Sequence, residues 1–206
     1  MSIASPYRPH PWHGIDPGRH FPETLTAYIE IVPTDGVKYE IDKLTGFLRV
    51  DRPQRFSSFC PTLYGFVPRT YCGRLVATYS LPGSPLVEKG DGDPLDLCVL
   101  TDRPISRGDL IMEVRPIGGL RMVENAEADD KIIAVLLGDP TFGELRDIGD
   151  VPRSVIDRLR HYFLTYKRIP GEAGPEITVE PIYGALDARA ILEAARADYR
   201  KAFEGG

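Results

Sequence analysis

The sequence predicts an α+β fold, in which a small antiparallel or mixed β-barrel is flanked by C-terminal helices. Short apolar runs separated by turn residues fill most of residues 27–137, no long helical periodicity appears before residue 100, and two segments with helical spacing close the chain. With 206 residues and 42% hydrophobic content, the chain can bury a substantial core, and we expect one domain over residues 1–206.

An extended arm is expected over residues 1–22. This stretch holds five prolines, and proline lacks the backbone donor that a helix interior needs. We expect Trp12 to pack the arm against the rest of the domain. His10 and His13 are interpreted as structural, because two histidines on a proline-rich arm without a third ligand are weak grounds for a metal site.

Seven strand candidates follow the arm, each a short run of β-forming residues bounded by turn residues. They are residues 27–32, 37–41, 47–50, 65–70, 97–100, 110–117 and 131–137. Their number and close spacing favour a barrel or a sandwich. Residues 73–89 interrupt the pattern with Gly, Ser and Pro, and we expect an inserted loop or hairpin there.

Two helices are predicted at the end of the chain. In residues 152–167, Pro152 suits the first helical turn, apolar residues recur from Val155 to Tyr166 at helical spacing, and the Pro-Gly pair at 170–171 ends the helix. The second helix begins near Asp187, an N-cap candidate, and continues towards the terminal glycines.

Composition excludes several classes of protein. The formal charge of -5 argues against a nucleic-acid binder that relies on a general basic field, so we expect any anion-binding site to be local and its ligand small. Three cysteines without CxxC spacing disfavour a disulfide framework and a thiolate zinc site, which suits a reducing cytoplasm. No apolar run reaches the ~18 to 20 residues that span a bilayer, so we expect no membrane partner.

The acidic turn DGDPLD, residues 91–96, is the strongest chemical signal. Asp91, Asp93 and Asp96 fall within six residues directly before an apolar strand candidate. Carboxylates this dense repel one another unless cations hold them, and Mg²⁺ prefers oxygen ligands. Turns also use Asp, Gly and Pro for reasons of their own, so the hexapeptide alone leaves open a metal site and an ordinary solvated turn.

Other charged clusters strengthen the first interpretation. Lys38 and Glu40 share one face of a predicted strand, although for this strand taken alone an exposed ion pair is the favoured explanation. Four acidic residues between 124 and 130 precede another apolar strand, and they are either solvated or part of the same cation site. The spacing from Asp91 does not match an EF-hand, and no P-loop or HExxH motif occurs. What is left is metal-assisted phosphoryl chemistry.

The chain resembles the soluble family I inorganic pyrophosphatases in the order and approximate spacing of seven segments. They are residues 29–31, 37–42, 50–52, 64–70, 91–96, 129–135 and 166–167. DGDPxD is the signature of that family, and the sequence HPWH at 10–13 is similar to its plant-type branch. The resemblance implies an OB-like barrel and hydrolysis of inorganic pyrophosphate to two phosphates, in a cytoplasmic protein that forms homo-oligomers.

The resemblance also implies roles for single residues. Several Mg²⁺ ions would be held or surrounded by carboxylates at Asp91, Asp96, Asp129, Glu124, Glu30 and Glu40. The two phosphates would be bound by Lys38, Arg52, Tyr64, Lys131, Tyr166 and Lys167. Asp93 matches the residue proposed to take the proton from the attacking water, and the implied reaction is in-line attack by a Mg-bound hydroxide without a covalent intermediate.

Three departures from the family pattern leave alternatives open. Glu124 stands where Asp is usual, and residues 73–89 are longer than the usual connection. Residues 60–63, which begin with Cys60, stand where the family usually has Tyr-Pro followed by a more polar pair. A pyrophosphatase-fold protein that has lost turnover and acts as a binding or scaffold partner is one alternative. A hydrolase for a nucleotide or a longer polyphosphate is another.

Overall fold

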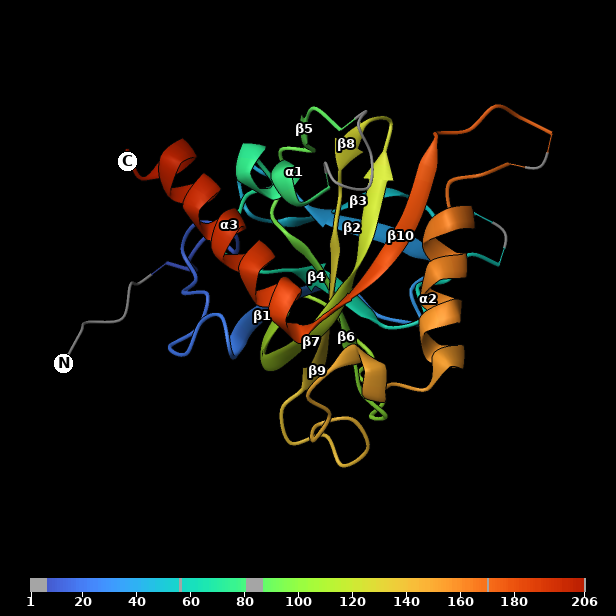
Figure 1. Cartoon of the computed structure of the whole chain (residues 1–206), viewed down its shortest axis with the longest axis horizontal. Helices are drawn as coiled ribbons and strands as arrows, with labels where there is room; N and C mark the ends of the chain where they lie inside the picture. Colours follow the sequence, from blue (N-terminus) through green and yellow to red (C-terminus); the bar gives the residue numbers. More distant parts are fainter. Residues whose placement is uncertain (1–6, 56, 81–86, 170, 206) are drawn as a thin grey trace.

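Five strands close into a ring in the part of the chain that the computed structural model describes, which is residues 7–55, 57–80, 87–169 and 171–205 (Figure 1). The strands of the ring, in spatial order, are β1 (Leu25–Ile31), β4 (Leu63–Phe66), β6 (Asp96–Leu100), β9 (Lys131–Leu136) and β7 (Leu110–Glu124), which pairs again with β1. Only β6 and β9 run parallel within this described ring. The predicted α+β barrel with C-terminal helices is confirmed.

The remaining elements extend or cover the ring. They are β2 (Val37–Ile41), β3 (Leu48–Pro53), α1 (Arg74–Ser80), β5 (Lys89–Gly90), β8 (Glu127–Ala128), the 3₁₀ helix η2 (Ile148–Asp150), α2 (Arg153–Thr165), β10 (Ile177–Gly184) and α3 (Ala185–Phe203). β2 and β3 form a separate hairpin, while β8, β5 and β10 lengthen the main sheet beside β7. Among the described helices, none is long and apolar enough to cross a membrane.

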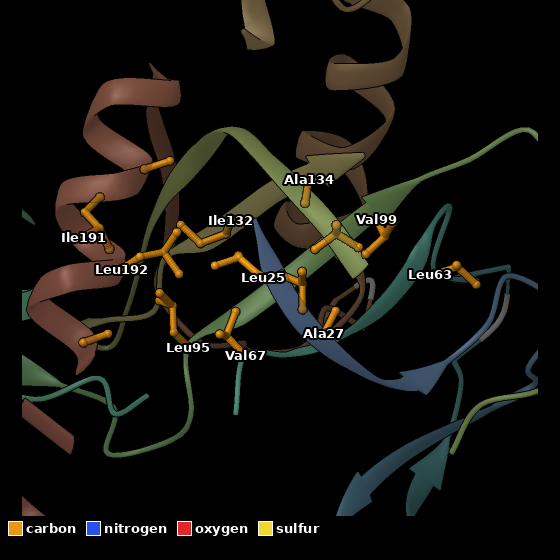
Figure 2. Close-up of a cluster of buried hydrophobic side chains, with 14 of the residues drawn as sticks. Leu25, Ala27, Leu63, Val67, Leu95, Val99, Ile132, Ala134, Ile191 and Leu192 are labelled. Carbon is orange, nitrogen blue, oxygen red and sulfur yellow. The ribbon is translucent and has the colours of Figure 1, made fainter. Parts of the chain in front are cut away.

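Strands β6 and β9 are buried on both faces, which explains their unbroken apolar sequences. Alternate residues enter two different clusters: Leu97 and Ile132 pack in one, Cys98 and Ile133 in the other. The first cluster includes Ile191 and Leu192 of α3, as Figure 2 shows, whereas the second includes the buried face of α2. The two helices flank the strands on either side (Figure 1).

Strand β4 approaches β1 so closely that one position requires glycine. A Cβ on Gly65 would lie 1.9 Å from the carbonyl oxygen of Tyr28, far inside van der Waals contact. Gly65 therefore lets the two backbones pair, and the pairing fixes the position of the neighbouring Tyr64.

The N-terminal arm contains turns, with no helix or strand in residues 7–24; residues 1–6 lie outside the described part. Trp12 is buried at 3% exposure, and its indole nitrogen donates to the carbonyl oxygen of Thr70 at 2.7 Å. The ring also packs beside Tyr199 and Phe203 of α3. The arm is thus fastened to the last helix and to the segment that precedes α1.

Helix α1 and strand β10 were not predicted from the sequence, and the strand expected over residues 65–70 ends at Phe66. A loop or hairpin was expected over residues 73–89, but Arg74–Ser80 form helix α1, while residues 81–86 lie outside the described part. Seven residues are too few for a helical period to stand out from the sequence. Strand β10 was missed because Pro181 interrupts it; a register shift between Val179 and Ile182 accommodates this proline.

Candidate active site

A cavity of about 270 Å³ opens where the two acidic loops, residues 91–96 and 124–130, meet. Its walls include ten of the residues singled out from the sequence, namely Lys38, Tyr64, Asp91, Asp93, Asp96, Glu124, Asp129, Lys131, Tyr166 and Lys167. They come from β2, β4, the start of β6 with the loop before it, the end of β7, the start of β9 with the turn before it, and the residues after α2. Six separate parts of the chain therefore converge on one cavity.

Backbone hydrogen bonds hold the acidic turn in shape. Gly92 adopts a positive φ of 80°, a conformation that glycine takes without strain. The amide of Asp91 donates to Ala128 at 3.2 Å, and the carbonyl of Asp93 accepts from Cys72 at 2.8 Å. The Asp91 carboxylate itself accepts from the Asp93 amide at 3.0 Å. These contacts aim the carboxylates before any ligand binds.

Lys131 connects the two acidic loops. Its side chain is buried, and its Nζ lies 2.5 Å from Oδ2 of Asp96 and also donates to Asp129. Tyr64 donates its hydroxyl to the same oxygen of Asp96. The parallel register of β6 and β9 places Asp96 directly opposite Lys131, so the sheet itself sets this contact.

Across the cavity, the Nζ of Lys167 donates to both carboxylate oxygens of Glu124, at 2.7 Å and 2.5 Å. Glu124 is the last residue of β7, and Lys167 follows α2 by two positions. The pair joins the end of a strand to the end of a helix. It is partly buried, since the two side chains are 28% and 14% exposed.

The β2–β3 hairpin carries the other basic groups. Lys38 lies 3.2 Å from Glu40 and 3.1 Å from Asp51. Arg52 also contacts Asp51, and its guanidinium lies 5.9 Å from the ring centroid of Tyr166. Arg52 does not line the cavity wall itself, and its Nη2 is buried without a hydrogen-bond partner among the described residues. That nitrogen is an unused donor at the edge of the site.

Glu30 and Glu40 line a smaller adjoining cavity of about 80 Å³. Glu30 is buried and accepts from the Ile41 amide at 2.7 Å. Burial, with the charge of Asp96, raises the pKa of Glu30 to about 8. Burial, with the charges of Asp129 and Asp96, raises the pKa of Asp91 to about 9. Both carboxyls thus hold protons near neutral pH when no cation is bound.

The charge balance of the main cavity fits divalent cations. In its described wall, six acidic side chains face three lysines. Oxygen donors in excess of local positive charge are what hard cations such as Mg²⁺ bind. No group of three or more His, Cys, Asp or Glu side chains is arranged as a ready metal cage within the described residues. Lysine ammonium groups lie between the carboxylates there, Lys131 above all.

Two residues of the site were missed from the sequence. Lys43 contacts the carboxylate of Asp93 from the turn after β2, and Asp51 joins Lys38 to Arg52. Asp51 lies beside Arg52 in residues 50–52, one of the seven segments that resemble the family, and this position could have identified it as a site residue. Lys43 lies in an ordinary turn between two strands, and no sequence pattern links it to residue 93.

Residues 27–200 match the family model described as inorganic pyrophosphatase. The chain belongs to the inorganic pyrophosphatase family. A pyrophosphatase of Chlamydia muridarum is 51% identical over 199 residues, with 94% of this chain and 95% of the relative covered. One of Chlamydia trachomatis serovar D is 50% identical over 208 residues, with coverage of 98% and 97%.

Solved pyrophosphatase structures share the fold. The inorganic pyrophosphatase of Thermus thermophilus has a TM-score of 0.77 and 32% identity, and the comparison covers 92% of this chain and 99% of that one. The Coxiella burnetii inorganic pyrophosphatase has a TM-score of 0.73 and 30% identity, covering 90% and 99%. The ring of strands and the C-terminal helices are thus those of an inorganic pyrophosphatase.

Proposed function

We propose that this protein hydrolyses inorganic pyrophosphate to two phosphates with the help of Mg²⁺. The observation that carries the proposal is a cavity in which carboxylates from two acidic loops lie beside three lysines from three different parts of the chain. Two multiply charged phosphates need cationic partners, and the cations need carboxylates. Membership of the family and the names of the chlamydial relatives support the same activity.

The residues that would hold Mg²⁺ are Asp91, Asp96 and Asp129, with Glu30, Glu40 and Glu124 around them. Asp129 and Glu30 are nearly inaccessible, so their ionised forms need a nearby cation more than exposed carboxylates do. When bound, a divalent ion supplies Lewis-acid polarisation of phosphate oxygens and makes a bound water more acidic.

Pyrophosphate would be bound by Lys38, Arg52, Lys131 and Lys167, with hydrogen bonds from Tyr64 and Tyr166. Arg52 suits this role because its Nη2 has no protein partner within the described part. A guanidinium also matches the planar geometry of phosphate oxygens. Tyr64 and Tyr166 are neutral donors, since burial raises the pKa of both phenols far above neutral.

Asp93 is the proposed proton acceptor. Its side chain is 45% exposed, against 19% for Asp96, and Lys43 contacts its carboxylate. A water attacks one phosphorus in line as the bond to the bridging oxygen breaks, and its proton passes to Asp93. The departing phosphate leaves with the electron pair of that bond, stabilised by the basic side chains.

A phosphate-release assay tests the function. We expect release from pyrophosphate with Mg²⁺ present, none after chelation, and a strong preference for pyrophosphate over ATP and tripolyphosphate. Absence of release between about pH 7 and 9 would refute the proposal. Faster release from ATP or tripolyphosphate would instead show a hydrolase of larger substrates.

We further propose that the protein is cytoplasmic and forms homo-oligomers, as the family resemblance implies, and that residues 1–206 form one domain of the plant-type branch with an insertion at 73–89. Three buried free cysteines, Cys60, Cys72 and Cys98, support a reducing compartment. Sedimentation equilibrium of the purified chain tests the oligomer. A monomer at micromolar concentration would contradict it.

A further inference from the structure

Arg121, on β7, makes three contacts with three other parts of the chain. Its Nε lies 3.3 Å from Oδ2 of Asp130, and its Nη1 donates to the carbonyl oxygen of Tyr79 in α1. Its guanidinium also lies 5.0 Å from the ring centroid of Tyr183 in β10. The side chain is only 12% exposed, so these contacts are made largely away from solvent.

Asp130 lies between two residues of the proposed active site. Asp129 and Lys131 line the cavity, whereas Asp130 does not and is fully buried on its own. Successive side chains of an extended backbone alternate in direction, so Asp130 faces Arg121 while its neighbours face the cavity. In the described residues the other oxygen of Asp130 has no hydrogen-bond partner, which makes the contact with Arg121 the main compensation for its charge.

Helix α1 is fixed at both of its ends. The carboxylate of Asp198 in α3 accepts from the amides of Leu75 and Val76 at 2.9 Å and 3.2 Å. At the other end, the Tyr79 carbonyl accepts from Arg121. The chain after α1 then returns as β5, which pairs in parallel with β8, directly before Asp129. Residues 74–80 are therefore tied to residues 129–131, the active-site turn, rather than lying free on the surface.

We propose that Arg121 is a positioning residue that holds Asp129 and Lys131 in their cavity positions through Asp130 and links them to helix α1. The inference rests on the proposed function only for its prediction about Mg²⁺. A guanidinium is required, because a single ammonium cannot bond the carboxylate and the Tyr79 carbonyl together while stacking on an aromatic ring.

The experiment compares Arg121→Met and Arg121→Lys with a matched control, Arg196→Met. Arg196 is also 12% exposed, lies 5.4 Å from the ring centroid of Tyr199, and donates to a backbone carbonyl and to Glu204, but it belongs to α3 and does not contact the active-site turn. Hydrogen exchange is measured without metal over residues 127–133. Calorimetric titration with Mg²⁺ then follows on the same full-length proteins.

We expect faster exchange in residues 127–133 for both Arg121 variants and a Mg²⁺ dissociation constant raised by about tenfold, the low end of what loss of an outer-shell partner costs. The control should lose thermal stability without either change. Wild-type exchange and Mg²⁺ affinity in Arg121→Lys would overturn the proposal, and this variant decides if Arg121→Met does not fold. If the wild type binds no Mg²⁺, the proposed function fails, and exchange alone decides the role of Arg121.

Discussion

The Nζ of Lys131 lies 2.5 Å from Oδ2 of Asp96, in a part of the sheet where Lys131 itself is only 2% exposed. The same ammonium contacts Asp129, so one cation neutralises carboxylates from both acidic loops. Burial lowers the pKa of Lys131, but the charges of Asp129 and Asp96 outweigh it and raise that pKa well above its usual value. Lys131 is therefore charged at neutral pH and stabilises the carboxylates that it contacts.

Lys131→Met should destabilise the metal-free protein by about 3 to 5 kcal/mol, because it leaves the carboxylates of Asp129 and Asp96, 12% and 19% exposed, without their cation. Added Mg²⁺ should restore part of this loss, since a ligand that binds only the folded state stabilises it. Urea unfolding with and without Mg²⁺ measures both effects. Lys89→Met is the control, because its ion pair with Glu127 is exposed and should contribute less than about 1 kcal/mol. An equal loss with and without Mg²⁺ would contradict the prediction.

Asp96→Asn should abolish most turnover and leave the fold intact. The change keeps the shape of the side chain but removes the charge that faces Lys131 and Tyr64. Phosphate release and circular dichroism check the two parts. Asp102→Asn, just beyond the far end of β6 and outside the cavity, should leave turnover near wild type. Near-wild-type activity in Asp96→Asn would remove it from the metal ligands.

Glu124→Gln should raise the Mg²⁺ concentration needed for half-maximal activity by about tenfold, whereas Glu124→Asp should raise it less. Glutamine lacks the negative charge that pairs with Lys167. Aspartate keeps this charge, but its side chain is shorter by ~1.5 Å. Glu113→Gln, at an exposed position of the same strand that does not line the cavity, is the matched control and should leave this concentration unchanged. The reverse order of effects would show that reach matters more than charge at this position.

Acid stability should depend on Asp139. Burial raises the pKa of this carboxyl, but hydrogen bonds from Thr101 and from the amides of Phe142, Asp102 and Thr141 outweigh it and lower the pKa to about 2, from 3.8. A lowered folded-state pKa adds stability above pH 3.8, and this contribution is lost as pH falls through about 2.

Asp139→Asn should therefore cost about 1 to 3 kcal/mol at pH 7, because an amide cannot accept all of these bonds. Its stability should then fall less steeply between about pH 4 and 2 than that of the wild type, a window set by linkage. Urea unfolding across this range tests the slope. Glu144→Gln, with a side chain 92% exposed, should follow the wild type. A slope unchanged in Asp139→Asn would assign the acid loss to other carboxyls.

Much of the fold was readable from local pattern. The apolar run at 97–100 and the helical spacing at 155–166 became β6 and α2, because burial of those side chains decides their local structure. Helix α1 and strand β10 could not be predicted in this way. Seven helical residues show too little periodicity, and Pro181 interrupts the strand pattern of β10, whose partner is β7.

For this protein, the sequence by itself determined which chemistry is present, since the dense carboxylates, the lysines and the tyrosines are already set by residue type and order. Only the tertiary structure decided which of them meet. The parallel register of β6 and β9 brings Lys131 to Asp96, and a turn after β2 brings Lys43 to Asp93. Such contacts join residues 35 and 50 positions apart, and strand pairing and packing, which no local pattern encodes, create them.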